Sequence, residues 1–292
     1  RSPLPTVLED DREFAAFLFD TRTDETLYIF TNRGNCYPLK VNAINECKPK
    51  DRGQQLAGII PGIEENEIPL YLMCLNPASL ASQPDLLFVT RWGRVKRALA
   101  ADFDVRSKKL VCMTLKGDDE IVSIFPATTR DDLLLVSRKA LCIRFALDDV
   151  PIQGRTSTGV SGMGVLDEDR VIFACQLEST SSIVLFTERG YGKRLPELDF
   201  TVQGRGGKGV KCLAFAKAGA NGRYLAGLVK VPSGQWGIVV HQAKSPASLI
   251  PVEDIAIQVR AGSGFMLVDA LFDDIVTSTD LTSMPGEAGS AE

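Results

Sequence analysis

One stretch of nine residues, VQGRGGKGV at 202–210, concentrates glycine and positive charge. It holds four glycines, an arginine and a lysine, and no acid. Glycine lets a backbone come close to a ligand, and the two basic side chains neutralise phosphates. The stretch is therefore predicted to bind a phosphate-bearing ligand. The alternative is a tight connection in which the glycines only supply positive φ angles.

Two nucleotide-binding motifs fit this stretch poorly. A phosphate-binding loop of the Walker type needs glycine where Val202 stands and a hydroxyl where Gly209 stands. A dinucleotide fingerprint needs a helix after its glycines and an acid about 20 residues on. Here 210–216 reads as a strand, and no acid follows until Glu253. The sequence favours a loop at a sheet edge, which approaches a phosphodiester backbone.

Charge is distributed unevenly along the chain. The net charge is −4, yet residues 200–252 carry +7 without a single acid, and residues 86–117 carry +6. The remaining 207 residues then carry −17. Such polarity favours a basic surface for an anionic partner, although the net charge itself leaves a protein–protein interaction module as an alternative.

Two landmarks recur about every fifty residues, which indicates five repeats. The first is a hydroxyl or histidine that ends an apolar strand, at Thr31, Thr90, Ser137, Thr187 and His241. The second is an arginine after a polar turn, at Arg52, Arg106, Arg155, Arg205 and Arg260. The last three of these arginines have a glycine four residues later, at Gly159, Gly209 and Gly264.

Short apolar runs such as 110–115, 120–125, 170–177 and 224–231 supply about four strands to each repeat, and no window shows sustained helical periodicity. The predicted fold class is all-β, with a propeller-like arrangement of about five four-stranded blades. One domain is expected over 14–276, with repeats near 14–77, 84–127, 131–179, 181–232 and 235–276. Residues 1–13 are expected to be a linker or the cut end of a longer chain, and 277–292 a disordered tail.

The composition excludes several other classes of protein. No apolar run is long enough to cross a bilayer, and the N-terminus does not resemble a signal peptide. The seven cysteines form no C-x-x-C pair and are expected to be free thiols in a reducing cytoplasm. Because His241 is the only histidine, a metal site or catalytic triad built on histidine is not expected.

Three stretches resemble one known family. Residues 203–209 (QGRGGKG) are similar to the signature heptapeptide Q-[R/K]-R-G-G-[R/K]-G of the C-terminal domain of the DNA gyrase A subunit. Residues 28–41 (YIFTNRGNCYPLKV) and 188–194 (ERGYGKR) resemble two further stretches of that domain. The resemblance spans about residues 14–275. It implies a β-pinwheel, which is a propeller-like disc whose blades exchange a strand.

The chain departs from the family pattern at two points. Gly204 stands where the principal heptapeptide, or box, has a basic residue, and the box-like loop lies in the fourth repeat instead of the first blade. Either a first blade lies outside this sequence or the chain is a divergent relative. The C-terminal domain of topoisomerase IV, a similar disc with degenerate boxes, therefore stays open as the alternative.

The resemblance also implies function and partners. It implies that the chain binds, bends and wraps double-stranded DNA without sequence specificity and supports negative supercoiling, in the bacterial cytoplasm and not at a membrane. Its other partners would be the ATPase subunit of an A2B2 holoenzyme and the N-terminal part of its own subunit. The resemblance implies no catalytic residue, metal or cofactor in this chain, because the reactive tyrosine, ATP and Mg²⁺ act on other parts of the holoenzyme.

The predicted DNA contacts lie on the rim. They comprise the box-like residues, their basic neighbours and the repeated arginines: Gln203, Gly204, Arg205, Gly206, Gly207, Lys208, Gly209, Arg189, Lys193, Arg194, Arg91, Arg94, Lys96, Arg97, Arg106, Lys108, Lys109, Arg138, Arg155 and Arg260. Gln203 is expected to cap the turn. Trp92 is expected in the core and not against DNA.

Overall fold

The computed structural model describes residues 6–7, 17, 19–48, 53–270 and 273–284. The chain divides into two compact units, each considered by itself. The two-sheet unit comprises Ala15–Arg130 and Ala146–Gly164. The three-sheet unit comprises Arg1–Phe14, Asp131–Phe145 and Val165–Glu292.

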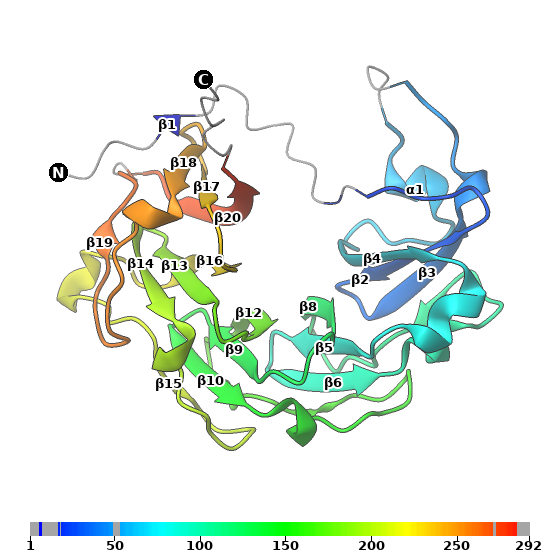
Figure 1. The fold of residues 1–292 in the computed structure, drawn as a ribbon, viewed down its shortest axis with the longest axis horizontal. Coiled ribbons are helices and arrows are strands. Elements are labelled where there is room, and N and C mark those ends of the chain that lie inside the picture. The colour runs from blue at the N-terminus through cyan, green and yellow to red at the C-terminus, as the bar shows by residue number, and fades with distance from the viewer. Residues whose placement is uncertain (1–5, 8–16, 18, 49–52, 271–272, 285–292) are drawn as a thin grey trace, which may run out of the picture. The chain divides into compact units, whose positions relative to one another are not determined.

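The two-sheet unit contains two antiparallel sheets of four strands (Figure 1). Its first sheet has the order β4-β2-β3-β7, and its second has the order β11-β6-β5-β8. The strands are β2 (Thr26–Thr31), β3 (Asn35–Lys40), β4 (Pro69–Leu75), β5 (Leu86–Thr90), β6 (Arg94–Ala98), β7 (Leu110–Val111), β8 (Ile121–Pro126) and β11 (Val160–Ser161).

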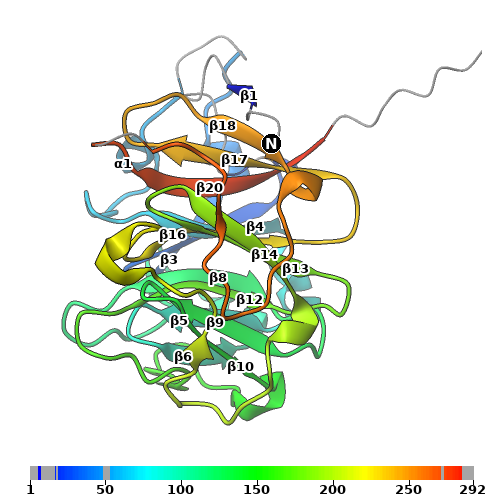
Figure 2. The ribbon, with the colours of Figure 1, turned by 90° about the vertical axis from the view of Figure 1, so that its left-hand side faces the viewer.

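The three-sheet unit contains three more sheets of four strands (Figure 2). Their orders are β12-β9-β10-β15, β16-β13-β14-β19 and β1-β18-β17-β20. The strands are β1 (Thr6–Val7), β9 (Leu133–Ser137), β10 (Leu141–Phe145), β12 (Val171–Gln176), β13 (Ser182–Thr187), β14 (Tyr191–Pro196), β15 (Val210–Lys211), β16 (Leu225–Val231), β17 (Trp236–Gln242), β18 (Ser248–Pro251), β19 (Phe265–Met266) and β20 (Val276–Ser283).

Helical structure is confined to short turns in the part of the chain that the structure describes. The second strand of every hairpin leads into one turn of 3-10 helix. The helices are α1 (Leu56–Ile59), η1 (Val41–Ala43), η2 (Pro77–Ser82), η3 (Ala100–Phe103), η4 (Leu147–Asp149), η5 (Glu197–Asp199), η6 (Lys217–Gly219) and η7 (Val252–Asp254). The prediction of an all-β fold with five four-stranded blades is confirmed.

Consecutive repeats exchange a strand, as the resemblance implied. The two-residue strands β7, β11, β15 and β19 each pair antiparallel with the hairpin of the preceding repeat. In the first sheet, for example, Asn35 pairs with Val111 and Cys36 with Leu110. Four of the five sheets are therefore complete only with a strand of the next repeat, and the fifth is completed by β1.

The repeated hydroxyl side chains are buried and stabilise the hairpin turns. Thr31, Thr90, Ser137 and Thr187 are fully buried, at 0% exposure. In three of them the hydroxyl oxygen accepts a hydrogen bond, 3.2 Å long, from the backbone N–H four residues later. Because a buried N–H without a partner is costly, this landmark of the repeats belongs to the fold and not to a surface site.

Apolar side chains from neighbouring repeats fill the space between the sheets of each unit. In the two-sheet unit Phe30, Phe88 and Phe103 are fully buried, and Phe30 meets Phe103 edge to face with ring centroids 4.9 Å apart. All seven cysteines are free, as predicted, and five of them are buried.

Two boundary predictions need correction. Residues 277–283, which were expected in a disordered tail, form most of β20 and pair with β17. Their composition is polar, but the three threonines fit an extended strand. Thr6–Val7, expected in a linker, form β1 and pair with β18. Residues 285–292 lie outside the described residues. None of the described helices is long and apolar enough to cross a membrane.

Candidate nucleic-acid interface

The repeated arginines lie in four equivalent loops, which we call the arginine loops. Each runs from the 3-10 turn of a hairpin to the exchanged strand that pairs with the preceding hairpin: Arg106 precedes β7, Arg155 precedes β11, Arg205 precedes β15 and Arg260 precedes β19. Figure 1 shows the third of these strands, β15, beside β10. The loops therefore occupy the same edge of their respective sheets. Arg52 lies outside the described residues.

A backbone hydrogen bond fixes the start of three arginine loops. A glutamine stands two residues before the arginine, and its N–H donates to an arginine carbonyl at the end of the preceding hairpin. The pairs are Gln153 with Arg97 (2.8 Å), Gln203 with Arg144 (2.7 Å) and Gln258 with Arg194 (3.1 Å). Gln203 thus holds the entry of its loop through its backbone, whereas the sequence suggested a capping side chain.

Within each unit, successive arginine loops are close to each other. In the two-sheet unit the Arg155 guanidinium donates to the Val111 carbonyl oxygen at 2.7 Å, directly after the preceding loop. In the three-sheet unit Arg260 donates to the hydroxyl of Thr201 at 3.2 Å, directly before the preceding loop. Within each unit, the arginines therefore lie one after another at the same edge of successive sheets. A continuous belt of arginines around the whole molecule stays a prediction.

The glycine four residues after the arginine is required by the fold. Gly159, Gly209 and Gly264 have φ angles of +71°, +75° and +77°. A Cβ atom on Gly209 would overlap the carbonyl oxygen of Cys142, and one on Gly159 would overlap that of Val95. The alternative interpretation, in which the glycines only allow a tight connection, therefore explains the glycine at this position.

Two other glycines of the box-like loop are not explained by the fold. A Cβ on Gly204 would meet nothing within 4 Å, and one on Gly207 would meet its nearest neighbour only at 3.7 Å. Neither residue is among those with positive φ, whereas Gly206 is, at +86°. Because the chain itself leaves room for a side chain at both positions, their small size is available for the approach of a ligand.

The basic side chains of these loops differ in exposure. Arg106, Lys108 and Lys208 are exposed, while Arg155, Arg205 and Arg260 are half-buried. Lys109 is also exposed and lies 3.5 Å from the Glu64 carboxylate. Lys211, which was not among the predicted contacts, is exposed in β15 just beyond the box-like loop. Its place in the acid-free stretch was the signal that could have identified it.

Lys96 and Lys193 were predicted as DNA contacts, and that prediction is wrong. Both side chains are fully buried, at 0% exposure, and each ammonium group donates hydrogen bonds to backbone carbonyl oxygens of the next arginine loop. The sequence did not indicate that they are buried, because their hydrogen-bond partners in the arginine loops lie in the next repeat, about sixty residues later in the chain.

The two buried lysines make the stability of the fold depend on pH. Burial lowers the pKa of both ammonium groups, in each case to about 8. In the unfolded chain the lysine pKa is about 10.4, so as the pH rises the folded state loses these protons first. The cost of burying the charge is thus fully present below pH 8 and falls above it, which stabilises the fold by about 2 kcal/mol per lysine at pH 9.5.

We expect the free energy of unfolding to rise from pH 7 to pH 9.5 by about 2 kcal/mol more in the wild-type chain than in Lys96→Met. Denaturant unfolding of both chains over this pH range measures the difference. The comparison cancels the tyrosines and cysteines that both chains share. A difference that does not change with pH would show that Lys96 keeps its ordinary pKa in the folded state.

Four further arginines that were predicted to contact DNA bind partners within the protein. Arg91 pairs with Asp118 at 2.7 Å, and Arg97 pairs with Asp85 at 3.4 Å. The remaining two guanidinium groups donate to backbone carbonyl oxygens: that of Arg94 to Thr158 at 3.1 Å and that of Arg194 to Val252 at 3.4 Å. These internal partners compete with any phosphate for the same donors.

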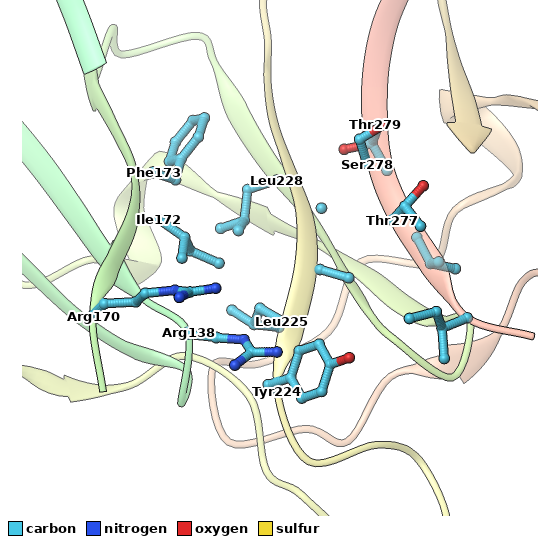
Figure 3. A pocket seen from close by; sticks show the side chains of 14 residues that line it. Arg138, Arg170, Ile172, Phe173, Tyr224, Leu225, Leu228, Thr277, Ser278 and Thr279 are labelled. Carbon is cyan, nitrogen blue, oxygen red and sulfur yellow. The ribbon is translucent and has the colours of Figure 1, made fainter. Parts of the chain in front are cut away.

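Arg138 lies apart from the arginine loops. It follows β9, its backbone N–H donates to the Arg170 carbonyl, and its guanidinium lies over the Tyr224 ring, 3.7 Å from the centroid (Figure 3). Both partners adjoin the β12 side of the sheet, whereas the box-like loop adjoins β15. Arg189 is half-buried in the following hairpin turn. Trp92, expected in the core, is 45% exposed.

Comparisons with known proteins agree with this architecture. The family model "DNA gyrase C-terminal domain, beta-propeller" matches residues 25–67, 84–128, 131–174 and 181–220, more than half of the chain. The DNA gyrase A protein of Staphylococcus epidermidis is 29% identical over 263 residues, which is 88% of this chain and 29% of the relative. That of Staphylococcus aureus strain MRSA252 is 28% identical over 276 residues, 93% of this chain and 30% of the relative.

Two solved structures share the fold. A crystal structure of the C-terminal domain of DNA topoisomerase IV matches with a TM-score of 0.82 and 28% identity, and covers 89% of this chain and 80% of its own. A DNA gyrase A C-terminal domain matches with a TM-score of 0.69 and 19% identity, over 94% and 89% of the two chains. The chain thus spans about three tenths of the curated relatives it matches. With five four-stranded blades, four of which are completed by a strand of the next repeat, and a matching family model, it belongs to the family of DNA gyrase C-terminal domains.

Proposed function

We propose that this chain binds and bends double-stranded DNA without sequence specificity, with the duplex lying along its arginine loops. Loops that share one sheet edge within each unit present positive side chains at regular intervals. Contacts with phosphates fix the position of a duplex but do not read its bases, and a series of them can hold DNA in a bent path. Family membership supports the same role.

The observation that carries the proposal is the spare room at Gly207. The fold does not require glycine at this position, yet it lies between the side chains best placed to neutralise phosphates, Arg205 and Lys208. A phosphodiester backbone in contact with the loop would explain why no side chain is present there.

In the whole protein, this chain acts as the non-catalytic C-terminal domain of a type IIA topoisomerase of the gyrase kind in the bacterial cytoplasm. It wraps a DNA segment and presents it for strand passage, which supports negative supercoiling. On this proposal, strand cleavage belongs to the N-terminal part of the same subunit and ATP hydrolysis to the ATPase subunit, as the family resemblance implies; this chain spans only about three tenths of its gyrase A relatives.

A topoisomerase IV-type role, in which the domain selects DNA geometry without strong wrapping, is the second candidate. The likeness to the topoisomerase IV domain, with a TM-score of 0.82, favours it. So does the glycine at position 204, which leaves the box-like loop with one basic residue fewer than the gyrase signature. The two roles differ in how strongly bound DNA is wrapped.

Titration of a labelled duplex at several salt concentrations tests DNA binding directly. The logarithm of the association constant should fall linearly with the logarithm of salt concentration, by about 0.9 for each phosphate contacted. Duplexes of unrelated sequence should bind alike. Binding that ignores salt, or that depends on one sequence, would contradict the proposal.

Replacing Gly204 by arginine should strengthen binding. The new side chain has room, since a Cβ there meets nothing within 4 Å, and it restores the basic residue of the gyrase signature. One further phosphate contact steepens the salt dependence by about 0.9 and raises the affinity about eightfold at 0.1 M salt. Gly154→Arg, at a glycine with equal room in the loop of Arg155, tests whether added charge alone is sufficient.

A further inference from the structure

Three repeats carry a buried residue at the same place beneath an arginine loop. It is the residue before the arginine that ends each hairpin: Lys96 in β6, Ile143 in β10 and Lys193 in β14. All three are fully buried, at 0% exposure. The loops above them are those of Arg155, Arg205 and Arg260, respectively, so the box-like loop is the one that lies over isoleucine.

Lys193 binds the backbone of the loop above it. Its Nζ donates to the carbonyl oxygens of Val259 at 3.0 Å, Arg260 at 2.7 Å and Gly262 at 2.9 Å. Three hydrogen bonds use every proton of an ammonium group. They draw three carbonyls of one turn toward a single point and so fix the direction in which the Arg260 side chain leaves the backbone.

Lys96 makes the equivalent contacts in the two-sheet unit. Its Nζ donates to the carbonyl oxygens of Gly154 at 3.4 Å, of Arg155, and of Cys112 at 2.6 Å in the segment that follows β7. The same buried ammonium thus connects an arginine loop to its neighbour, and the same arrangement occurs in both units.

The box-like loop has no such connection at this position. Ile143 offers no hydrogen-bond donor, and its Cδ1 atom would lie 3.7 Å from a Cβ built on Gly207. An apolar side chain can pack under the loop, but it cannot bind a carbonyl oxygen and hold it in one orientation.

From these contacts we infer that Lys96 and Lys193 are positioning residues, which fix the loops of Arg155 and Arg260 in one conformation before DNA arrives. Ile143 provides no such hydrogen bond to residues 203–209, so this loop can adjust its conformation to the duplex. The statement that the loops meet DNA rests on the proposed function. The statement that the two lysines fix the loop conformation rests on the structure alone. A preformed loop binds without an ordering cost, whereas an adjustable loop can follow a bent backbone at that cost.

The protonation of the two lysines makes this role depend on pH. Burial lowers the pKa of Lys193 to about 8, and Arg260 lowers it as well, whereas Asp199 and the thiols of Cys142 and Cys212 act in the opposite direction. When the loop opens to water, Lys193 regains the ordinary lysine pKa of about 10.4. Opening of the loop is therefore expected to become less favourable as the pH rises through 8.

Lys96 has the same dependence in the two-sheet unit. Its pKa is also lowered to about 8 by burial, and the groups that face it are Asp102, Arg155 and the Cys112 thiol. The Phe88 ring adds a cation–π contact, with Nζ 5.2 Å from the ring centroid. Opening of the loops above Lys96 and Lys193 should therefore become less favourable over the same range of pH.

Hydrogen exchange of the backbone amides in the full chain tests the loop part without DNA. We expect Lys193→Met to raise exchange in 259–264 at least tenfold and to leave 203–209 unchanged. Lys211→Met, at an exposed lysine of the same unit, is the control and should change neither. In the wild-type chain, exchange corrected for its intrinsic rate should fall between pH 7 and pH 9 in 259–264, because opening that exposes Lys193 becomes less favourable, and this fall should disappear in Lys193→Met.

The wild-type chain also tests the inference if the variant does not fold. Without DNA, residues 203–209 should exchange faster than 154–159 and 259–264, and an added 40-base-pair duplex should protect them most. Equal exchange of the three loops, or an unchanged 259–264 in a folded Lys193→Met, would overturn the inference. If the duplex protects no loop, the proposed DNA binding is wrong. The exchange of 259–264 in Lys193→Met still shows whether Lys193 fixes the conformation of that loop.

A double-mutant cycle separates positioning from direct contact. If Lys193 acts through the loop of Arg260, Lys193→Met should weaken duplex binding severalfold in the wild-type background and hardly at all in Arg260→Ala. Additive losses would show that Lys193 contributes to DNA binding independently of Arg260, contrary to the inference.

Discussion

Replacing Arg205 and Lys208 together by alanine is expected to weaken duplex binding roughly 50-fold at 0.1 M salt. Each phosphate contact contributes about 0.9 to the slope of log affinity against log salt, so two lost contacts lower that slope by 1–2 units. The loss should be similar for duplexes of any sequence, because phosphate contacts carry no base readout. A salt series of duplex titrations measures both quantities.

The matched control removes two other positive charges from the same unit. Lys217 and Arg223 are both exposed and lie in the same acid-free stretch, but outside the arginine loops. Lys217→Ala/Arg223→Ala has the same net charge as the loop variant and should keep nearly the wild-type slope. If both variants lost the same amount, binding would depend on the general charge of the unit and not on the loop.

Replacing Gly209 by alanine is expected to destabilise the three-sheet unit by about 3 kcal/mol. The residue has φ of +75°, where a side chain is strained, and the added Cβ would overlap the Cys142 carbonyl oxygen. Backbone strain of this kind costs about 1–3 kcal/mol, and the displacement of β10 from β15 adds to it. Denaturant unfolding of the full chain measures the loss.

Gly207→Ala is the control and separates fold from function within one loop. A Cβ at this position meets its nearest neighbour at 3.7 Å, so the free energy of unfolding should stay within about 0.5 kcal/mol of wild type. Duplex affinity should fall all the same, because the methyl group occupies space that the phosphodiester backbone needs. Unchanged affinity in Gly207→Ala would remove the main support for close approach of DNA.

The fold was predictable from the sequence because its repeats are regular in two independent landmarks. The hydroxyls recur because three of them accept a hydrogen bond from a backbone N–H in a hairpin turn. The arginine loops recur because each leads into an exchanged strand. Local composition was less reliable at the ends of the chain, where the polar strand β20 owes its structure to pairing with β17.

The candidate site was predictable as a set of loops but not residue by residue. Lys96 and Lys193 have the charge of a phosphate ligand, and only their fold partners, which lie in the next repeat, show that they are internal. Arg97 is likewise engaged by Asp85, twelve residues earlier in the chain. Which basic residues face solvent depends on the strand exchange, and periodicity within one repeat does not contain that information.

Ligation of a nicked plasmid in the presence of the full chain tests most directly whether bound DNA is wrapped. After the nick is sealed and the protein removed, the mean linking number should be shifted in one direction, in proportion to the amount bound. The shift should be lost in Arg205→Ala/Lys208→Ala and should increase in Gly204→Arg. A linking number that stays at the protein-free value while the plasmid is saturated would contradict wrapping along the arginine loops.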